Sequence, residues 1–328
     1  MKEKISPKGI WQVLKNAFSG FSDDKVMKLS ASLAYYTVFS IGPTIIVIIY
    51  VAGLIYGREA VQGTIFDQIK GLVGASAAVQ IQDMIKNAAL NTEGHFAFVI
   101  GIVTLVLGAT SVFAEIQDSI NQIWNLKPKP KKSWLKMITD RLLSFSVIIS
   151  LGFILLVSLL LNGVLEILMD RLQARFPNVA VVVIYIVNIL ITFIIISTLF
   201  GVIFKVLPDA VIKWKDVITG SMVTAVLFML GKFAITFYIG KSDIGGTYGA
   251  AGSLVILLLW VYYSSVILYF GAEFTKAYAA KYGGAIHPSP YAVWVKNIEV
   301  EEKHGSLKEQ ELKKQEHNDN TGDHIKVT

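Results

Sequence analysis

Long stretches with almost no charged residue alternate with polar segments along the chain. Six apolar stretches lie at about residues 34–56, 96–114, 142–165, 180–204, 217–239 and 250–272. Each has about the 20 residues that an α-helix needs to cross a hydrocarbon core roughly 30 Å thick. Lipid offers the backbone no hydrogen-bond partner, so each stretch must satisfy its own N–H and C=O groups as a helix. The pattern predicts an all-α, polytopic membrane protein with six transmembrane helices.

Lysine and arginine are concentrated in every second polar segment. The segments before residue 34, at 115–141, at 205–216 and after 272 carry most of them, and the segments in between carry few. Basic residues close to a membrane span favour the cytoplasmic side. Both termini are therefore predicted to be cytoplasmic, which agrees with an even number of spans. The net charge of +6 follows from this placement, and it does not call for a nucleic-acid partner.

Three parts follow along the chain. Residues 1–33 form a predicted cytoplasmic N-terminal segment, and residues 34–282 form the transmembrane domain, with an outer helical loop at 57–95. Residues 283–328 form a charged tail, which is predicted to be disordered in the cytoplasm. Around Trp11 and Phe18 the N-terminal segment is mildly amphipathic. Two interpretations stay open there: a helix on the inner membrane surface and a short solvated helix.

The composition excludes several classes of function. The chain has no cysteine, which rules out disulfides, thiolate metal sites and a cysteine nucleophile. Charged residues make up 16% of the chain, against about 25% in a soluble domain. The sequence has no phosphate-binding P-loop, no serine-hydrolase elbow and no zinc-protease motif. These absences predict that the chain is not an enzyme and that it carries no cofactor and no metal.

A few polar side chains interrupt the apolar stretches, and such groups are costly in hydrocarbon. Lys232 is the clearest case, because it is the formal charge inside the predicted fifth span. Its long side chain can reach outward to the membrane surface, or it can face the helix bundle and bind an anionic group. Asn188 in the fourth span, Asn162 in the third and Tyr36 in the first are the other candidate substrate-binding residues.

Acidic residues mark the predicted inner ends of two spans. Glu115, Asp118 and Gln122 recur at helical spacing and form one polar face after the second span. Glu273 follows the sixth span, where Lys276 on the next turn or a basic loop residue can pair with it. These carboxylates are either ordinary residues of a wet helix end or an inner gate or ion site.

Small residues and one proline suggest where helices bend and approach closely. Pro43 removes a backbone hydrogen bond within the first span and predicts a kink. Gly220, Gly249 and Gly252 allow close contact between helices. Packing alone explains these residues, and they would also suit a protein that changes shape.

The sequence resembles the YihY/BrkB family of bacterial inner-membrane proteins. The resemblance covers about residues 10 to 282, and it rests on the segments ASLAYYTVFS at 31–40 with Pro43, LPD at 207–209 with Trp214 and Gly220, YGAAGSL at 248–254, WVYYSS at 260–265 and GAE at 271–273. Some members of this family carry an old ribonuclease label, and others are linked to serum resistance and envelope traits. The resemblance implies a multi-pass protein of the bacterial cell membrane.

Two classes of function follow from these observations. The favoured one is a transporter or a lipid-handling protein of the cell envelope, and the alternative is a non-transporting membrane scaffold or envelope-assembly factor. Metal-dependent RNA cleavage needs clustered histidine and carboxylate ligands. Four of the five histidines follow Gly284, so ribonuclease activity is disfavoured. The expected partners are membrane lipids with anionic headgroups, and no nucleic acid; the substrate and the oligomeric state are left open.

Overall fold

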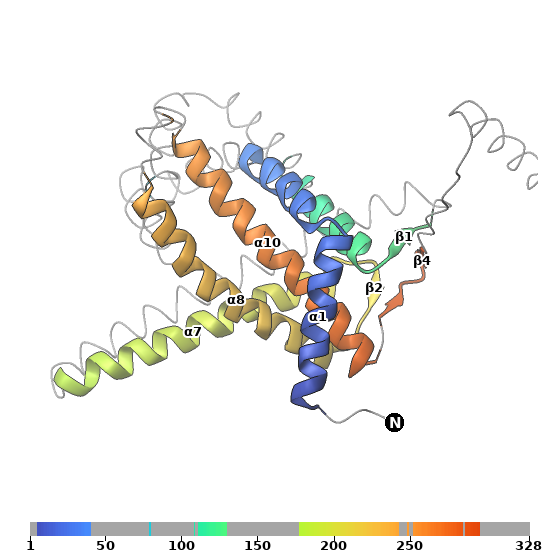
Figure 1. Ribbon diagram of the computed structural model, residues 1–328, viewed down its shortest axis with the longest axis horizontal. Helices are drawn as coiled ribbons and strands as arrows, with labels where there is room; N and C mark the ends of the chain where they lie inside the picture. The colour runs from blue at the N-terminus through green and yellow to red at the C-terminus, as the bar shows by residue number, and fades with distance from the viewer. Residues whose placement is uncertain are drawn as a thin grey trace, which may run out of the picture. The chain divides into compact units, whose positions relative to one another are not determined.

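The computed structural model describes residues 5–40, 79, 108, 111–129, 177–242, 248, 252–284 and 286–295. Its elements are α1 (Pro7–Asp23), helices at 26–40 and 111–123, β1 (Leu126–Pro128), α7 (Pro177–Val206), β2 (Ala210–Val211), α8 (Trp214–Lys241), α10 (Gly252–Lys281), β3 (His287–Pro288) and β4 (Ala292–Trp294) (Figure 1). The described part is mostly helical, as predicted. All these elements belong to one unit, Met1–Trp294, and a second unit comprises Val295–Thr328. The predicted third span, most of the outer loop at 57–95 and the tail after 295 lie outside the described residues.

Three of the described helices are long and apolar enough to cross a membrane: Ile186–Val206, Trp214–Ile239 and Leu254–Lys281. They coincide with the predicted fourth, fifth and sixth apolar stretches. The sixth stretch was expected to end at residue 272, but α10 continues to Lys281. The charged residues that suggested an end, Glu273 and Lys276, pair with each other on α10, and Lys276 also pairs with Asp24 of the segment that packs against this helix.

The free faces of these helices are apolar. On α8, Leu230 is 65% exposed and Phe233 is 76% exposed, and α7 exposes Ile186, Leu190 and Ile194 in the same way. A contiguous apolar surface of this kind is unfavourable in water and favourable against lipid chains. The exposed faces therefore agree with the lengths of the helices in pointing to a membrane protein.

The N-terminal segment lies along α10 in two helical pieces. Helix α1 begins at Ser6, whose Oγ accepts a hydrogen bond from the N–H of Gly9 at 3.1 Å. It ends at Asp24, and Lys25 then adopts a left-handed conformation with φ of 53° before the helix at 26–40 begins. The contacts run antiparallel to α10, from Gly9 beside Tyr282 to the buried residues of 34–38 beside Leu257.

Helices α8 and α10 meet through two matching pairs of small residues. A Cβ atom on Gly220 would lie 1.9 Å from the Oγ1 of Thr275, and one on Gly271 would lie 2.1 Å from the Oγ1 of Thr224. Each threonine hydroxyl donates to the carbonyl of the glycine one turn earlier on its own helix, at 2.7 Å. The threonines therefore bring no unpaired polar atom into the contact, and the two backbones can approach closely.

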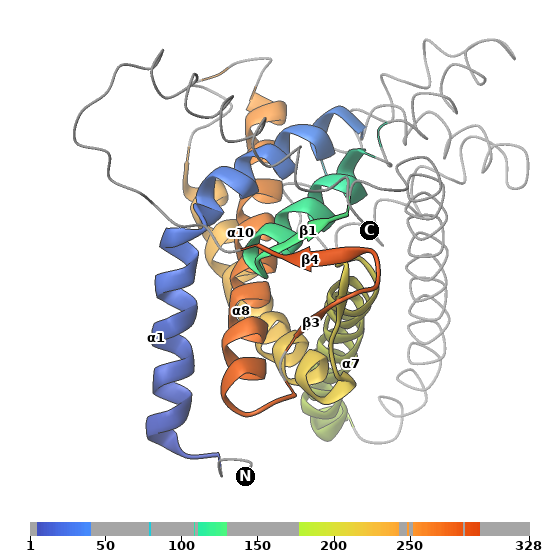
Figure 2. The ribbon, with the colours of Figure 1, turned by 90° about the vertical axis from the view of Figure 1, so that its right-hand side faces the viewer.

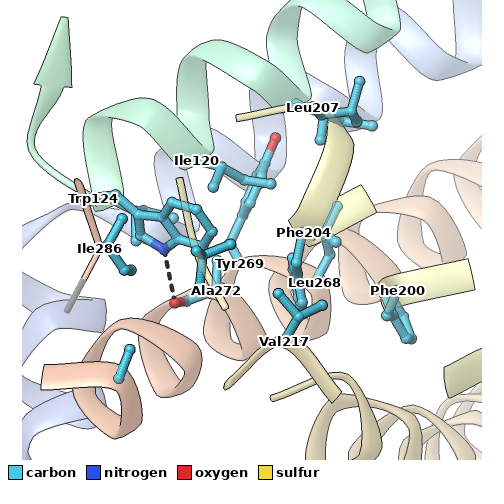
Figure 3. Packing of buried hydrophobic residues seen from close by; sticks show 14 of the residues in the cluster. Ile120, Trp124, Phe200, Phe204, Leu207, Val217, Leu268, Tyr269, Ala272 and Ile286 are labelled. Atoms are coloured by element: carbon cyan, nitrogen blue, oxygen red, sulfur yellow. Dashed lines mark hydrogen bonds between the residues drawn. The ribbon is translucent and has the colours of Figure 1, made fainter. Parts of the chain in front are cut away.

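A single hydrophobic core joins these helices to the helix at 111–123. Figure 3 shows Trp124 packed among Ile120, Tyr269 and Ile286, with its indole N–H donating to the carbonyl of Ala272 at 3.1 Å. On the other side of the core, Phe204 is fully buried and Phe200 packs against Phe228 of α8, with ring centroids 5.7 Å apart. A buried indole N–H needs such an acceptor, so this bond fixes the orientation of the ring.

Two short antiparallel sheets, which the sequence pattern did not predict, close this end of the molecule. Leu126–Pro128 pairs with Ala292–Trp294, and Ala210–Val211 pairs with His287–Pro288. The chain that leaves α10 therefore runs back over two connections, one after the helix at 111–123 and the other between α7 and α8 (Figure 2). This return strand ties the ends of four helices together.

Candidate functional site

A buried carboxylate lies where α1 passes over α10. Glu273 is 2% exposed, although it belongs to a long apolar helix. A Cβ atom on Gly20 would lie 2.4 Å from its Oε2, so the glycine allows the backbone of α1 to cover the carboxylate directly. Among the described residues, the Oε1 atom accepts no hydrogen bond. Burying a carboxylate costs several kcal/mol unless charges and hydrogen bonds offset it.

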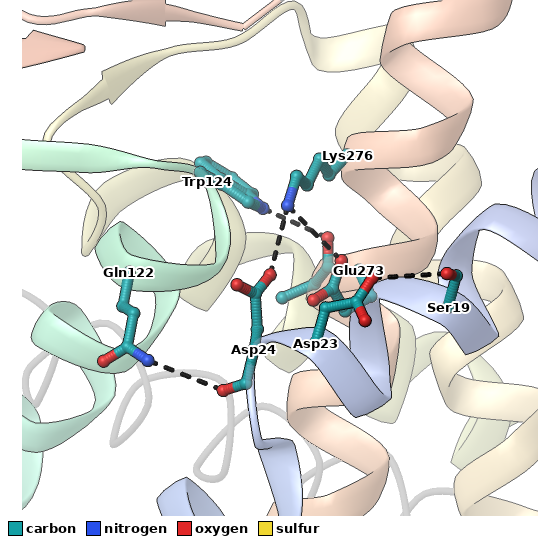
Figure 4. A network of polar contacts seen from close by, with 8 residues as sticks. Ser19, Asp23, Asp24, Gln122, Trp124, Glu273 and Lys276 are labelled. Carbon is teal, nitrogen blue, oxygen red and sulfur yellow. Dashed lines mark hydrogen bonds and ion pairs between the residues drawn. The ribbon is translucent and has the colours of Figure 1, made fainter. Parts of the chain in front are cut away.

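One lysine lies between Glu273 and a second carboxylate. The Nζ of Lys276 is 3.7 Å from Glu273 Oε2 and 3.2 Å from Asp24 Oδ2, as Figure 4 shows. Asp24 comes from the turn after α1, which Gln122 contacts by donating to the Asp24 carbonyl at 3.5 Å. The cluster of Asp24, Glu273 and Lys276 thus joins two segments that are far apart in the sequence, and Gln122 ties a third segment to it. With all three groups ionised it carries one excess negative charge, which a proton or a cation would neutralise.

A second polar contact fastens the connection between α7 and α8. Asn121 donates to Asp209 Oδ2 at 2.9 Å and accepts from the N–H of Asp209 at 2.8 Å, while Gln117 donates to Asp209 Oδ1 at 3.4 Å. Asp209 belongs to the segment Leu-Pro-Asp that the sequence analysis used only for the family resemblance. Asn121 and Gln117 were missed, although their spacing of four residues places them on one helix face.

A second buried carboxylate links the start of α8 to the end of α10. Asp216 is 4% exposed and accepts a hydrogen bond from the N–H of Gly284 at 3.1 Å. It lies in the first turn of α8, where the helix dipole favours a negative charge. A Cβ atom on Gly283 would lie 2.4 Å from this carboxylate, so the two glycines allow the chain to turn closely around it. We assign Asp216 a structural part, because both the helix dipole and the backbone satisfy it.

The residues expected to bind a substrate differ in their exposure. Lys232 is half-buried on α8, whereas Asn188 of α7 and Tyr36 of the helix at 26–40 are exposed. Asn162 lies outside the described residues. A shared polar space around these four side chains therefore stays a prediction.

The residues expected at a gate come from two helices, α10 and the helix at 111–123. Glu273 lies in the buried cluster, and Gln122 contacts the cluster through Asp24. Glu115 is half-buried and Asp118 is exposed on the helix at 111–123. Among the residues expected to bend helices or pack closely, Gly220 lies against Thr275 and Gly252 is buried at the start of α10. Pro43 and Gly249 lie outside the described residues.

Residues 17–292, which include nearly every element of the helical unit, match the family model described as virulence factor BrkB. The chain belongs to this family. This match confirms the resemblance that the sequence motifs indicated. It also includes both segments of the buried cluster, so Asp24, Glu273 and Lys276 lie inside the BrkB region and not in an addition to it.

Several relatives of the chain are described as membrane proteins. A UPF0761 membrane protein of Stenotrophomonas maltophilia is 26% identical over 274 residues, which cover 79% of this chain and 59% of the relative. Those of Tolumonas auensis and Haemophilus influenzae are each 26% identical, over 77% of this chain and over 80% and 90% of the relatives. The chain thus spans about three fifths of the length of the Stenotrophomonas relative. No solved structure matches the chain.

Proposed function

We propose that this BrkB protein is a transporter or lipid-handling protein of the bacterial cell membrane, with six spans, cytoplasmic termini and a gate at the cluster of Asp24, Glu273 and Lys276. The observation that carries the proposal is the burial of Glu273 on a helix long enough to cross a membrane. An ionisable group in such a position is costly, and it is commonly part of a substrate, ion or proton pathway.

The depth of the cluster supports a gate. Residues 254–272 of α10 cover about 28 Å at 1.5 Å per residue, which matches the hydrocarbon core. Glu273 then lies at the boundary between hydrocarbon and headgroups. In the orientation indicated by the basic segments, this boundary faces the cytoplasm. A cargo or a cation leaving the bundle on that side would meet this charged cluster.

The way the cluster is assembled supports a change of shape. Lys276 attracts a carboxylate from α10 and another from the turn after α1 at the same time. Protonation of Glu273, or a cation bound beside it, weakens its hold on Lys276 and shifts the balance toward Asp24. The turn at Asp24 and Lys25, which already departs from helical geometry, is then the point at which α1 moves relative to the helix at 26–40.

In this function the chain makes and breaks no covalent bond, and it acts as a non-enzymatic membrane protein without a nucleic-acid partner. Lys232 is the group that binds an anion within the bundle. An anionic headgroup is a suitable cargo because it pairs with this lysine while its acyl chains stay in lipid.

The test is transport by the purified full-length protein in vesicles of phosphatidylethanolamine and phosphatidylglycerol. Translocation of a nitrobenzoxadiazole-labelled phosphatidylglycerol is followed by its reduction with external dithionite, and proton flux is followed with trapped pyranine. We expect activity in one of the two assays, and we expect Glu273→Gln to lower it roughly tenfold or more, because the variant loses the charge that holds Lys276. Lys232→Met should abolish lipid translocation.

The matched control is Asp23→Asn, which removes an exposed carboxylate one residue before Asp24 and should leave transport unchanged. Correct folding of each variant is checked by its thermal unfolding midpoint. Equal flux in Glu273→Gln and the unmutated protein would overturn the gate. An unmutated protein that is inactive in both assays but crosslinks to one stoichiometric partner in native membranes would replace transport with the scaffold function.

A further inference from the structure

Helix α1 has two apolar faces, and α10 covers one of them. Gly9, Val13 and Ala17 are buried against α10, in a cluster with Phe270 and Phe274. The second face adjoins the first and is formed by residues that share a side at 100° per residue: Ile10, Trp11, Leu14 and Phe18. At its edge toward α10, Leu14 is partly buried and the ring centroid of Phe18 lies 4.9 Å from that of Phe270. On this second face, Trp11 is 70% exposed and Phe18 is 62% exposed. Two large aromatic side chains this exposed on one face of a helix are unfavourable in water.

A basic strip borders this exposed face. Lys8 and Lys15 are seven residues apart, which places them in line along the helix, between the exposed apolar face and the polar side that carries Gln12 and Ser19. Both lysines are exposed. Aromatic residues flanked by lysines along one side of a helix are typical of helices that lie in the membrane interface.

The packing of α1 places this face at the level of lipid headgroups. Gly9 contacts Tyr282 and Gly20 contacts Glu273, so α1 follows the last turns of α10. If residues 254–272 fill the hydrocarbon core, residues 273–281 extend about 13 Å beyond it, through the headgroup layer. Figure 2 shows α1 on the flank of α10, with its far side turned away from α8 and α10. Tryptophan is enriched at this depth in membrane proteins.

We propose that the exposed face of α1 docks onto an anionic lipid surface, with Phe18 at the boundary of the acyl chains, Trp11 among the headgroups, and Lys8 and Lys15 binding lipid phosphates. The membrane is the occupant because the face is both apolar and bordered by cations, and because its depth is that of the headgroups. The inference rests on membrane insertion of α10 and is independent of transport. Docking also bears on Glu273, because Gly20 of the same helix covers that carboxylate.

The test uses spin labels, which the absence of cysteine in the chain makes straightforward. Full-length variants Trp11→Cys and Ser19→Cys are labelled with a nitroxide in phosphatidylglycerol nanodiscs, and the accessibility of each label to oxygen and to an aqueous nickel complex is measured. We expect the label at residue 11, on the docked face, to be more accessible to oxygen relative to nickel than the label at residue 19, on the polar side of the helix. Both side chains are exposed, so neither substitution disturbs the contact with α10.

The dependence on lipid charge gives a second readout. In phosphatidylcholine nanodiscs the label at residue 11 should become more accessible to nickel, and adding Lys8→Gln and Lys15→Gln should remove the difference between the two lipids. The matched control, Lys213→Gln with Lys215→Gln at the start of α8, should preserve it. Equal nickel accessibility at residues 11 and 19 would overturn the proposal. A residue-11 label that is immobile and shielded from both reagents in either lipid would also overturn it, because protein would then cover the face.

Discussion

The end of α10 and the first half of α7 are both helical and rich in large side chains, yet their side chains are covered in different ways. Around residues 269–276 of α10, Ala272 accepts from Trp124, Thr275 bonds within its own helix and Lys276 pairs with two carboxylates. Along residues 182–194 of α7, apolar side chains are exposed and Asn188 is exposed with them. Specific partners within the protein fix the side chains at the end of α10, whereas the exposed side chains of α7 are left to contact lipid.

The largest loss of stability is expected at the contact between α8 and α10. Gly220→Ala places a methyl group 1.9 Å from the hydroxyl of the buried Thr275, which has no room to move. We expect a loss of about 3 kcal/mol in the free energy of unfolding, because overpacking forces the helices apart. Thermal unfolding in nanodiscs provides the measurement.

Gly231→Ala on the same helix is the matched control. The methyl group there would meet the hydroxyl end of Tyr263, a half-buried ring that can rotate away. A smaller loss is therefore expected, since alanine also favours the helix by about 1 kcal/mol over glycine. Equal unfolding midpoints for the two variants would mean that the Gly220 contact does not limit how closely the helices approach.

A second prediction concerns the connection between α7 and α8. Asn121→Ala removes both hydrogen bonds that this side chain exchanges with Asp209, and it leaves the carboxylate and the N–H without those partners. The expected cost is about 2 kcal/mol. Asn16→Ala, at an exposed position of α1, is the control and should change stability little.

A double-mutant cycle sharpens this second prediction. If the two side chains act as a unit, Asp209→Ala should cost much less in the Asn121→Ala background than in the unmutated protein. Purely additive losses would show that Asn121 and Asp209 stabilise the fold independently.

The smallest effect is expected on the free face of α8. Phe233→Leu exchanges one apolar side chain for another at a position that is 76% exposed, so the unfolding midpoint should stay within the equivalent of about 0.5 kcal/mol. Val217→Ala, at a fully buried position of the same helix, provides the contrast, because it creates a cavity. A loss at residue 233 as large as at residue 217 would mean that protein rather than lipid surrounds this face.

The long helices could be predicted because their signal is local. An uninterrupted apolar run in α7, α8 and α10 already determines how each segment meets a lipid solvent. The same logic ended the sixth stretch too early, at residue 272. Glu273 looked like an exposed helix end, and its burial depends on Gly20, which is more than 250 residues away. No periodicity links such distant positions.

The candidate site was accessible from the sequence only in part. Lys276 as a neighbour of Glu273 follows from a spacing of three residues, which brings side chains together on any helix. Asp24 could not be found in this way, because its segment showed only a mild amphipathic pattern. The short sheets were missed for a similar reason: two or three residues per strand are too few to show alternation.

The antiparallel course of the first 36 described residues along α10 has a consequence for biosynthesis. Asp24 and Lys276 are separated by 252 positions, so at roughly 5–20 residues per second the ribosome needs on the order of 13–50 s after Asp24 to supply its partner. During this delay the apolar residues of α1 lack α10 to cover them. The nascent segment must meanwhile be sheltered by the bilayer surface or by a chaperone, and α10 completes the packing of α1 once it has been translated.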